Sequence, residues 1–259
     1  MHSTAAETVR YLRAHGGFIS GQEIADRLGV TRAAVWKHIT VLRENGFDIS
    51  SSTKKGYKLD SVPDIPSEEV LSSLLNTISF GKTIEYHQVI ESTNTRAMSL
   101  GHQGASEGTV VTADSQTAGK SKGGGSWVSP SGKNLYMSVL LKPEVSADRL
   151  FEVERMALDS LARAVSACCP ELPLELLETG LFTGERKIGG VLCEACGEIG
   201  RIHHAVAGIG LNVTHRSESP YTGSILELTG RTLSRAELTA SVLEYFEAAY
   251  RKWLRHEQR

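Results

Sequence analysis

Two predicted helices near the N-terminus have start and stop signals whose spacing fits a helix-turn-helix. Ser20 is followed three residues later by Glu23, a capping box that opens a helix over residues 22–28. Gly29 ends that helix, and Thr31 caps the next one, which runs to about Asn45. Two short helices joined through a glycine turn in this way form a helix-turn-helix.

A strand-turn-strand pattern follows these helices. Gly46-Phe-Asp-Ile-Ser and Gly56-Tyr-Lys-Leu are short strand-like segments on either side of Ser51-Ser-Thr-Lys-Lys, which is typical of a wing. A further helix is predicted over residues 5–14. The apolar residues spaced to form a small core are Leu28, Val30, Val35, Ile39 and Leu42. We therefore predict a winged helix-turn-helix domain over residues 1–60.

The basic residues of this region lie where such a domain contacts DNA. A recognition helix presents short polar or basic side chains at its N-terminal turns, where they reach base edges in the major groove. The candidates there are Thr31, Arg32, Ala33 and Lys37. Lys54 and Lys55 at the tip of the wing suit phosphate or the minor groove, and His38 is expected to face solvent or phosphate. Residues 1–60 hold nine Lys/Arg against six Asp/Glu in a chain of net charge −2. Binding of double-stranded DNA is the prediction, and a module for protein contacts alone is the alternative.

The segment Asp60 to Pro66 carries two prolines within four residues and is typical of a linker. We predict a linker over residues 61–66 and a second domain over residues 67–259. Helices are expected near 67–75, 93–100, 147–167 and 234–255, and strands near 83–89, 109–113, 134–141, 190–193 and 202–206, with 211–213 just beyond. This pattern predicts an α+β domain with its strands in one mixed sheet.

Composition excludes several classes of protein. Hydrophobic residues make up 40% and charged residues 22% of the 259 residues, which is ordinary for a globular protein. No apolar run approaches the length of a membrane span, and the N-terminus lacks a basic-then-apolar signal. Four cysteines in a chain of this length do not indicate a disulfide scaffold. We expect a cytoplasmic protein with no membrane partner.

Six sequence motifs together resemble one family. Arg32-Ala-Ala-Val-Trp-Lys-His-Ile with Gly56-Tyr-Lys-Leu is similar to the head of the bifunctional biotin protein ligases and biotin operon repressors. The second domain carries further matches in the family's order: Glu91-Ser-Thr-Asn, Gln116-Thr-Ala-Gly, Trp127-Val-Ser-Pro-Ser-Gly-Lys-Asn-Leu-Tyr, Arg186-Lys-Ile-Gly-Gly-Val-Leu-Cys-Glu and Gly208-Ile-Gly-Leu-Asn-Val. The resemblance spans essentially the whole chain and implies a biotin/lipoate ligase-like mixed-sheet domain after the winged helix.

The resemblance also implies a ligand pocket. Ser92, Thr93 and Gln116 match positions that hydrogen-bond the ureido end of biotin, and Asn212 matches a position beside the nucleotide. A buried urea needs both donors and acceptors, which hydroxyls and an amide supply. The full set of candidate ligand-binding residues is Ser92, Thr93, Asn94, Gln116, Gly119, Lys120, Lys122, Trp127, Lys187, Gly190 and Asn212.

The chain departs from the family pattern on the catalytic side. Where the family has Arg-Gly-Arg-Arg-Gly-Arg, this chain has Lys120-Ser-Lys-Gly-Gly-Gly, which indicates a mobile loop and lacks the arginines that grip phosphate bidentately. Where the family has Lys-Trp-Pro-Asn-Asp, this chain has Leu176-Leu-Glu-Thr-Gly. We therefore expect Leu176 and Gly180 to delete two charges of the reaction centre, and Glu178 to repel anions. The resemblance further implies a small β-barrel after the last helix, and because the sequence stops at Arg259 we expect this barrel to be missing.

These departures favour a pseudo-ligase: a ligand-responsive transcription regulator that binds operator DNA as a homodimer and senses biotin or another metabolite. It would require no cofactor and have no confident catalytic residue. The alternative is an active biotin protein ligase that also represses. That enzyme would use ATP, biotin and Mg²⁺, with Lys120, Lys122 and Lys187 in the charge-neutralising roles.

The cysteines allow a further interpretation. Cys193-x-x-Cys196, with Cys168-Cys169 and His203-His204, includes half of a zinc-knuckle pattern. Cysteine is often a small buried apolar side chain, which explains the pattern without a metal. We expect no metal site, and a metal or thiol switch through Cys193 and Cys196 is the alternative.

Overall fold

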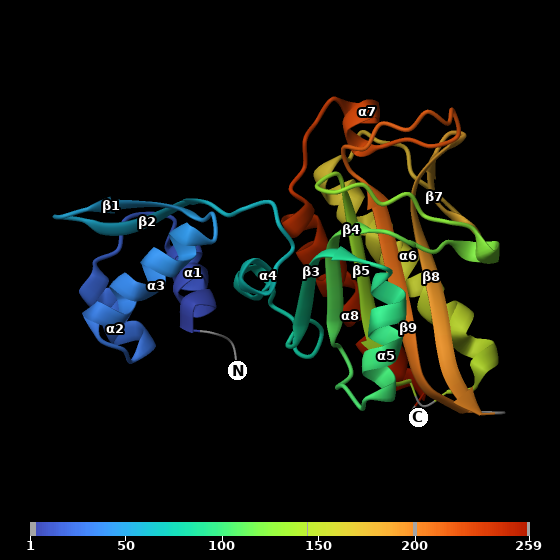
Figure 1. Ribbon diagram of the computed structural model, residues 1–259, viewed down its shortest axis with the longest axis horizontal. Helices are drawn as coiled ribbons and strands as arrows, with labels where there is room; N and C mark the ends of the chain where they lie inside the picture. Colours follow the sequence, from blue (N-terminus) through green and yellow to red (C-terminus); the bar gives the residue numbers. More distant parts are fainter. Residues whose placement is uncertain (1–3, 144, 199–200, 258–259) are drawn as a thin grey trace.

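The computed structural model describes residues 4–143, 145–198 and 201–257 and divides into a small head and a larger body (Figure 1). The head consists of α1 (Thr4–His15), α2 (Gly21–Leu28), α3 (Arg32–Glu44), β1 (Asp48–Ser52) and β2 (Gly56–Ser61). The caps confirm the predicted signals: Ser20 accepts a hydrogen bond from the Glu23 backbone N–H, and Thr31 accepts one from Ala34. Gly29 ends α2 with a left-handed φ of 65°.

The apolar core of the head is continuous with that of the body, and the wing is fastened to the helices. Val35, Ile39 and Leu42 are buried as predicted, whereas Leu28 and Val30 are partly buried beside them. Gly56 begins β2 with a φ of 94°, and an added Cβ would lie 1.9 Å from the Ile19 carbonyl oxygen. Only glycine fits this close approach.

One prediction about the recognition helix is wrong. His38 does not face solvent or phosphate, because its Nδ1 lies 3.3 Å from the Thr8 hydroxyl on α1. Burial, and then the neighbouring Lys37, lower the pKa of His38. Its ring belongs to the packing between α1 and α3.

Polar contacts join the head and the linker to the body. Arg10 of α1 donates a hydrogen bond to the Ser72 carbonyl, 2.5 Å away. In the linker, Asp64 pairs with the buried Arg235 at 3.1 Å, and the Thr112 hydroxyl donates to the Pro66 carbonyl. The predicted boundaries of 1–60, 61–66 and 67–259 remain a prediction.

A seven-stranded mixed sheet forms the centre of the body. Its strand order is β3-β4-β5-β9-β8-β7-β6, in which β3 and β4 are parallel and the other neighbours antiparallel. The strands are β3 (Ile84–Ile90), β4 (Val110–Gln116), β5 (Asn134–Leu141), β6 (Glu175–Leu177), β7 (Gly180–Thr183), β8 (Arg186–Glu198) and β9 (Arg201–Asn212). This arrangement confirms the predicted α+β class and mixed sheet.

Helices cover both faces of the sheet (Figure 1). On one face, α5 (Thr93–His102) packs Ala97 against Val111, Leu140 and Val206. The other face holds the main core beneath α6 (Leu150–Cys168) and α8 (Arg235–Glu257). The remaining helices are α4 (Glu68–Leu74) and α7 (Ile225–Thr229), with short 3₁₀ turns at Lys122–Gly124 and Ala147–Arg149.

The predicted strands differ from the structure mainly at one edge of the sheet. The edge hairpin of β6 and β7 was not predicted. All three residues of β6 are exposed, so the strand shows no alternation between buried and exposed positions. β9 is longer than expected and includes the segment around Leu211. Within the described ranges, no helix is both long and apolar enough to cross a membrane.

A candidate ligand pocket and a candidate DNA-binding groove

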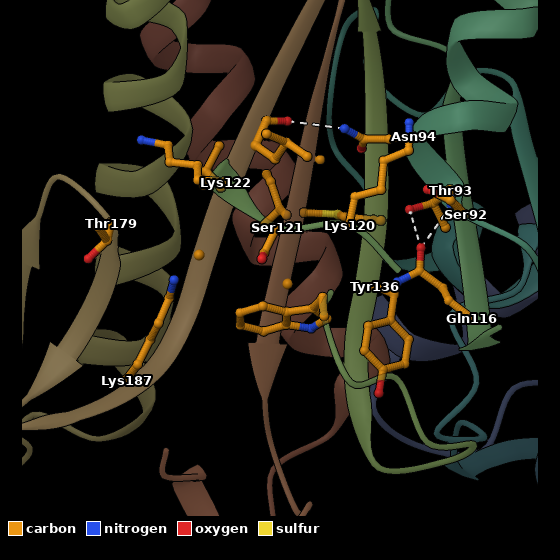
Figure 2. A pocket seen from close by; sticks show the side chains of 18 residues that line it. Ser92, Thr93, Asn94, Gln116, Lys120, Ser121, Lys122, Tyr136, Thr179 and Lys187 are labelled. Carbon is orange, nitrogen blue, oxygen red and sulfur yellow. Dashed lines mark hydrogen bonds between the residues drawn. The ribbon is translucent and has the colours of Figure 1, made fainter. Parts of the chain in front are cut away.

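A pocket open to solvent lies between the start of α5, the strands β5, β8 and β9, and the loop after β4. Its mixture of apolar side chains and a few polar groups suits a small organic molecule. Figure 2 shows Lys187 and Thr179 on one side of the cavity and Ser92, Thr93 and Gln116 on the opposite side. The lining residues are Ser92, Thr93, Asn94, Gln116, Lys120, Ser121, Lys122, Trp127, Tyr136, Met137, Thr179, Lys187, Gly190, Val191, Leu192, Gly208, Ile209 and Gly210.

The end of the pocket at α5 is a network of hydroxyl and amide groups. Ser92 caps the helix by accepting from the Thr95 backbone N–H. Gln116 Oε1 accepts from both the backbone N–H and the hydroxyl of Thr93, at 2.9 and 3.2 Å. Gln116 Nε2 donates to the Ser129 hydroxyl at 3.0 Å. The amide of Gln116 is therefore held in one orientation, with its oxygen toward α5.

Asn94 continues this network toward β8. Its Oδ1 accepts from the Ser138 hydroxyl at 2.6 Å, and its Nδ2 donates to a carboxylate oxygen of Glu194 at 2.9 Å. Asn94 is buried against Gly208 of β9, where an added Cβ would lie 1.9 Å from Asn94 Oδ1. Glycine at this strand position is therefore what admits the asparagine side chain.

The middle of the pocket is a tryptophan lying on glycine backbone. An added Cβ at Gly210 would lie 2.8 Å from the Trp127 ring, so the indole packs directly on β9. Trp127 Nε1 is buried and has no hydrogen-bond partner among the described residues. Such a donor is available to an acceptor on a bound molecule.

Lys187 provides a half-buried positive charge in this pocket. Its Nζ lies 5.7 Å from the centroid of the Trp127 ring. Burial, and then the positive charge of Lys122, lower the pKa of Lys187. Lys187 forms no ion pair with any residue in the described part of the chain. A ligand carboxylate would stabilise its charged form.

The two lysines of the glycine-rich loop differ from Lys187, because both are already paired. Lys120 Nζ lies 3.3 Å from a carboxylate oxygen of Glu194. Lys122 Nζ forms an ion pair with Glu154 of α6 and donates to the Glu178 carbonyl at 2.7 Å. The loop itself turns tightly, with φ of 71° at Gly123 and 76° at Gly124.

The structure brings most of the predicted ligand residues together. All of the candidates except Gly119 and Asn212 line the pocket. Gly119 packs just behind it, since an added Cβ would lie 2.5 Å from the Trp127 carbonyl oxygen. Asn212 lines an adjoining cavity, and its amide is engaged within the protein by Asn134 and the Gly223 carbonyl. Contact of these residues with a ligand remains a prediction.

The structure places the three residues that depart from the family pattern on the catalytic side. Leu176 is exposed on the edge strand β6 and is not among the lining residues. Glu178 likewise has an exposed side chain outside the lining, and its contact with Lys122 is through the backbone carbonyl. Gly180 does matter: an added Cβ would lie 2.7 Å from Lys187 Cε, so a carboxylate there would be next to the lysine.

The sequence analysis missed part of the lining. The missed residues are Ser121, Tyr136, Met137, Thr179, Val191, Leu192, Gly208, Ile209 and Gly210. The spacing of Gly208 and Gly210 carried a signal, because residues two apart in a strand face the same side and two glycines there leave room for side chains above them.

A second hollow lies on the head, between the recognition helix and the wing. It is lined by Ser20, Gly21, Gln22, Arg32, Ala33, Trp36, Arg43, Ser51, Ser52, Thr53, Lys54, Gly56 and Tyr57. The predicted DNA contacts Thr31, Arg32, Ala33, Lys37, Lys54 and Lys55 are all exposed. Trp36, which is 63% exposed, was not predicted as a contact although it precedes Lys37 on the same helix.

Comparisons with known proteins agree with this architecture. Residues 5–58 match a family described as an HTH domain, and residues 86–212 match the biotin/lipoate A/B protein ligase family. The bifunctional ligase/repressor BirA of Bacillus spizizenii is 32% identical over 99% of this chain and 81% of its own length. The chain belongs to the BirA family of bifunctional ligase/repressors.

Other members of the BirA family show the same relationship. The bifunctional ligase/repressor BirA of Escherichia coli is 29% identical over 92% of this chain and 74% of its own length. The structure of the biotin protein ligase from Aquifex aeolicus in complex with biotin and ATP aligns with a TM-score of 0.56 at 27% identity, covering 66% of this chain and 72% of that one. The resemblance found in the sequence is thereby confirmed, as is its fold of an HTH head followed by a biotin ligase-like domain.

Proposed function

We propose that this protein is a transcription regulator that binds operator DNA through its winged helix and senses a small molecule in the ligase-type pocket, as a pseudo-ligase. The observation that best supports the loss of ligase chemistry is the pairing of both loop lysines with carboxylates of the chain itself, Lys120 with Glu194 and Lys122 with Glu154. Transfer of a nucleotidyl group requires several cations around the phosphates at once. With the loop lysines engaged, Lys187 is the pocket lysine that remains unpaired among the described residues.

The pocket suits a ligand with a polar ring and one carboxylate, such as biotin. Lys187 offers a cation on one side, and the unpartnered Nε1–H of Trp127 offers a donor in the middle of the pocket. Gln116 and the hydroxyls of Ser92 and Thr93 offer donors and acceptors on the other, and the family resemblance implies that these three bind a ureido group. The opposed placement of the two sets favours a molecule that spans the pocket between them.

The DNA-binding half of the proposal is supported by exposure and charge on the head. Arg32 and Lys54 lie on opposite walls of the hollow between α3 and the wing. The family resemblance implies that two bodies dimerise, that ligand binding orders the glycine-rich loop, and that two heads then occupy half-sites of an inverted repeat. Homodimerisation coupled to the ligand is part of this proposal.

An active biotin protein ligase that also represses is the second candidate. Two observations favour it: the relatives are bifunctional ligase/repressors, and Lys187 of Arg186-Lys-Ile-Gly-Gly lines the pocket. In that case Lys120 and Lys122 would exchange Glu194 and Glu154 for the phosphates of ATP–Mg²⁺. Charge-assisted contacts of this kind stabilise a transition state only if the cations are released from their present partners.

One experiment separates the candidates. Calorimetric titration of the full chain with biotin is repeated with ATP–Mg²⁺, and the mixture is analysed by mass spectrometry for biotinyl-adenylate. Binding of biotin without adenylate is the expected result. Formation of adenylate would overturn the pseudo-ligase in favour of the ligase, and absence of biotin binding would show that the pocket serves another metabolite.

A further inference from the structure

Three potential metal ligands from three separate elements meet at the end of the sheet remote from the start of α5. His102 is the last residue of α5, Cys196 lies in β8, and His204 lies in β9. Their ligand atoms all lie within 4.8 Å of one another. The imidazole rings of His102 and His204 are in edge-to-face contact, with centroids 4.8 Å apart.

The pairing of β8 with β9 and the approach of α5 bring these residues together. Cys196 and His204 are direct partners in the antiparallel pairing of β8 and β9. Directly opposed residues on one face of a sheet have neighbouring side chains. On α5, Gly101 lets the third ligand approach, because an added Cβ there would lie 2.4 Å from His204 Cδ2.

His204 itself has an unmet hydrogen-bonding requirement. It is 5% exposed, and its buried Nε2 has no hydrogen-bond partner among the described residues. A backbone hydrogen bond to Met98 engages the ring. A metal-binding histidine is commonly oriented by such a backbone contact while the remaining nitrogen coordinates the ion.

Metal coordination requires the neutral imidazole of a histidine. His102 contributes a second imidazole at the C-terminal end of a ten-residue helix, where the helix dipole attracts cations.

We propose that His102, Cys196 and His204 form a zinc-binding site, with a water molecule as the fourth ligand. Two imidazoles and one thiolate are a ligand set that zinc prefers, and three protein ligands plus water is one of its common arrangements. Tetrahedral zinc places such ligand atoms about 3.3–3.6 Å apart, so the ligand atoms of these side chains must move closer to one another by about 1 Å. The exposed His102 and the half-buried Cys196 have the freedom to do so.

This site is not the one that the sequence pattern suggested. Cys193 and Cys196 do not act together, because Cys193 pairs with Ala207 and packs in the core beneath α6, whereas Cys196 lies on the α5 side. Cys168 and Cys169 end α6, which packs on the opposite face of the sheet from α5. The expectation of no metal site is therefore replaced by this proposal, with His102 as the ligand that sequence spacing could not indicate.

The proposal is independent of the proposed function, although the two sites share a helix. α5 begins at the pocket with Ser92 and Thr93 and ends at His102. A bound ion would fasten the end of α5 to β8 and β9. Because an ion that binds the folded state alone stabilises it by mass action, zinc should raise the melting temperature.

The test uses the full chain, reduced with a phosphine and freed of metal with a chelator, and then titrated with Co²⁺ as a spectroscopic probe. We expect one Co²⁺ per chain, with a thiolate-to-cobalt charge-transfer band, intense d–d bands of tetrahedral cobalt, and displacement of both by Zn²⁺. Cys196→Ser should abolish the charge-transfer band. His102→Gln and His204→Gln should each weaken binding by at least the 10–100-fold seen for outer partners of metal ligands.

Matched controls lie on the same two strands. Cys193→Ser and His203→Gln change a cysteine and a histidine that are not among the three ligands, and both should leave the cobalt spectrum unchanged. His102 is exposed, so His102→Gln tests the site even if a buried variant fails to fold. Absence of the charge-transfer band in the unmodified chain, or its persistence in Cys196→Ser, would overturn the proposal.

Discussion

Lys187 lies over the ring of Trp127, and these two side chains together line two adjoining cavities. The first cavity holds the hydroxyl and amide groups of α5, and the second contains Asn212 and His215. The Lys187–Trp127 pair is therefore the point that any molecule extending from one cavity to the other must pass.

Replacement of Lys187 should separate ligand binding from stability. Lys187→Met removes a charge-assisted contact of about 1.5–3 kcal/mol, so affinity for a carboxylate ligand should fall by about 10–150-fold. Because the pKa of Lys187 is lowered in the folded state, its charge opposes folding at neutral pH. The variant should therefore unfold at higher urea concentration than the unmodified protein. Lys252→Met, on the exposed face of α8, serves as the control and should change neither quantity.

The pH dependence of ligand affinity should show the same lowered pKa. Affinity for a carboxylate should be constant while Lys187 is protonated and should decline as pH rises through a pKa below the ordinary lysine value. The destabilising effect of this charge should fade over the same pH window, between the lowered pKa and the ordinary one. Lys187→Arg stays charged and should not show the alkaline decline. An identical decline in that variant would assign the titration to another group.

Release of the loop lysines should increase the affinity of the pocket for polyanions. Glu154→Gln and Glu194→Gln together remove the carboxylates that pair with Lys122 and Lys120. We expect binding of pyrophosphate or ATP to strengthen about tenfold, the effect of roughly 1.4 kcal/mol from two partly exposed charges. Glu175→Gln on the exposed strand β6 is the control. Unchanged polyanion affinity in the double variant would show that pairing of the loop lysines is not what limits the pocket.

A methyl group at Gly208 should disrupt the network at the start of α5. The added Cβ would overlap Asn94 Oδ1, which is fixed by Ser138 and backed by β8. Overpacking of this kind costs about 1–3 kcal/mol. Gly208→Ala should lower the free energy of unfolding, measured by urea denaturation, by that amount and should weaken ligand binding. Gly104→Ala, at a helix end with open space around it, should leave ligand binding intact.

Charge removal on the head should weaken DNA binding in two distinct ways. Lys54→Ala with Lys55→Ala should lower affinity for all sequences and reduce the dependence of log affinity on log salt by about two. Arg32→Ala should lower affinity for the preferred operator by about 1–3 kcal/mol and relax its specificity, provided Arg32 reads a base. Lys252→Ala should have no effect. Equal losses on specific and random DNA for Arg32→Ala would reassign that residue to phosphate contact.

Local signals in the sequence predicted much of the fold. The hydroxyls of Ser20 and Thr31 cap α2 and α3 because a cap depends on residues three positions apart, which the sequence displays directly. The ordered motifs of the body likewise predicted half of the residues that line the pocket. The edge hairpin was missed because β6 is exposed throughout and β7 is only four residues long, so neither strand carries a periodic apolar pattern.

The sequence by itself determined most of the helices, although not α7, together with the wing, the family and the residue types available to the pocket. Only the tertiary structure decided which charges are free, because ion pairs such as Lys122 with Glu154 join residues far apart in the chain. It also decided that Cys196 meets His204 and His102 rather than Cys193, since strand register and the path of α5 set that contact. Local signals act over a few residues, whereas these pairings depend on the order of strands in the sheet and the helices packed on it.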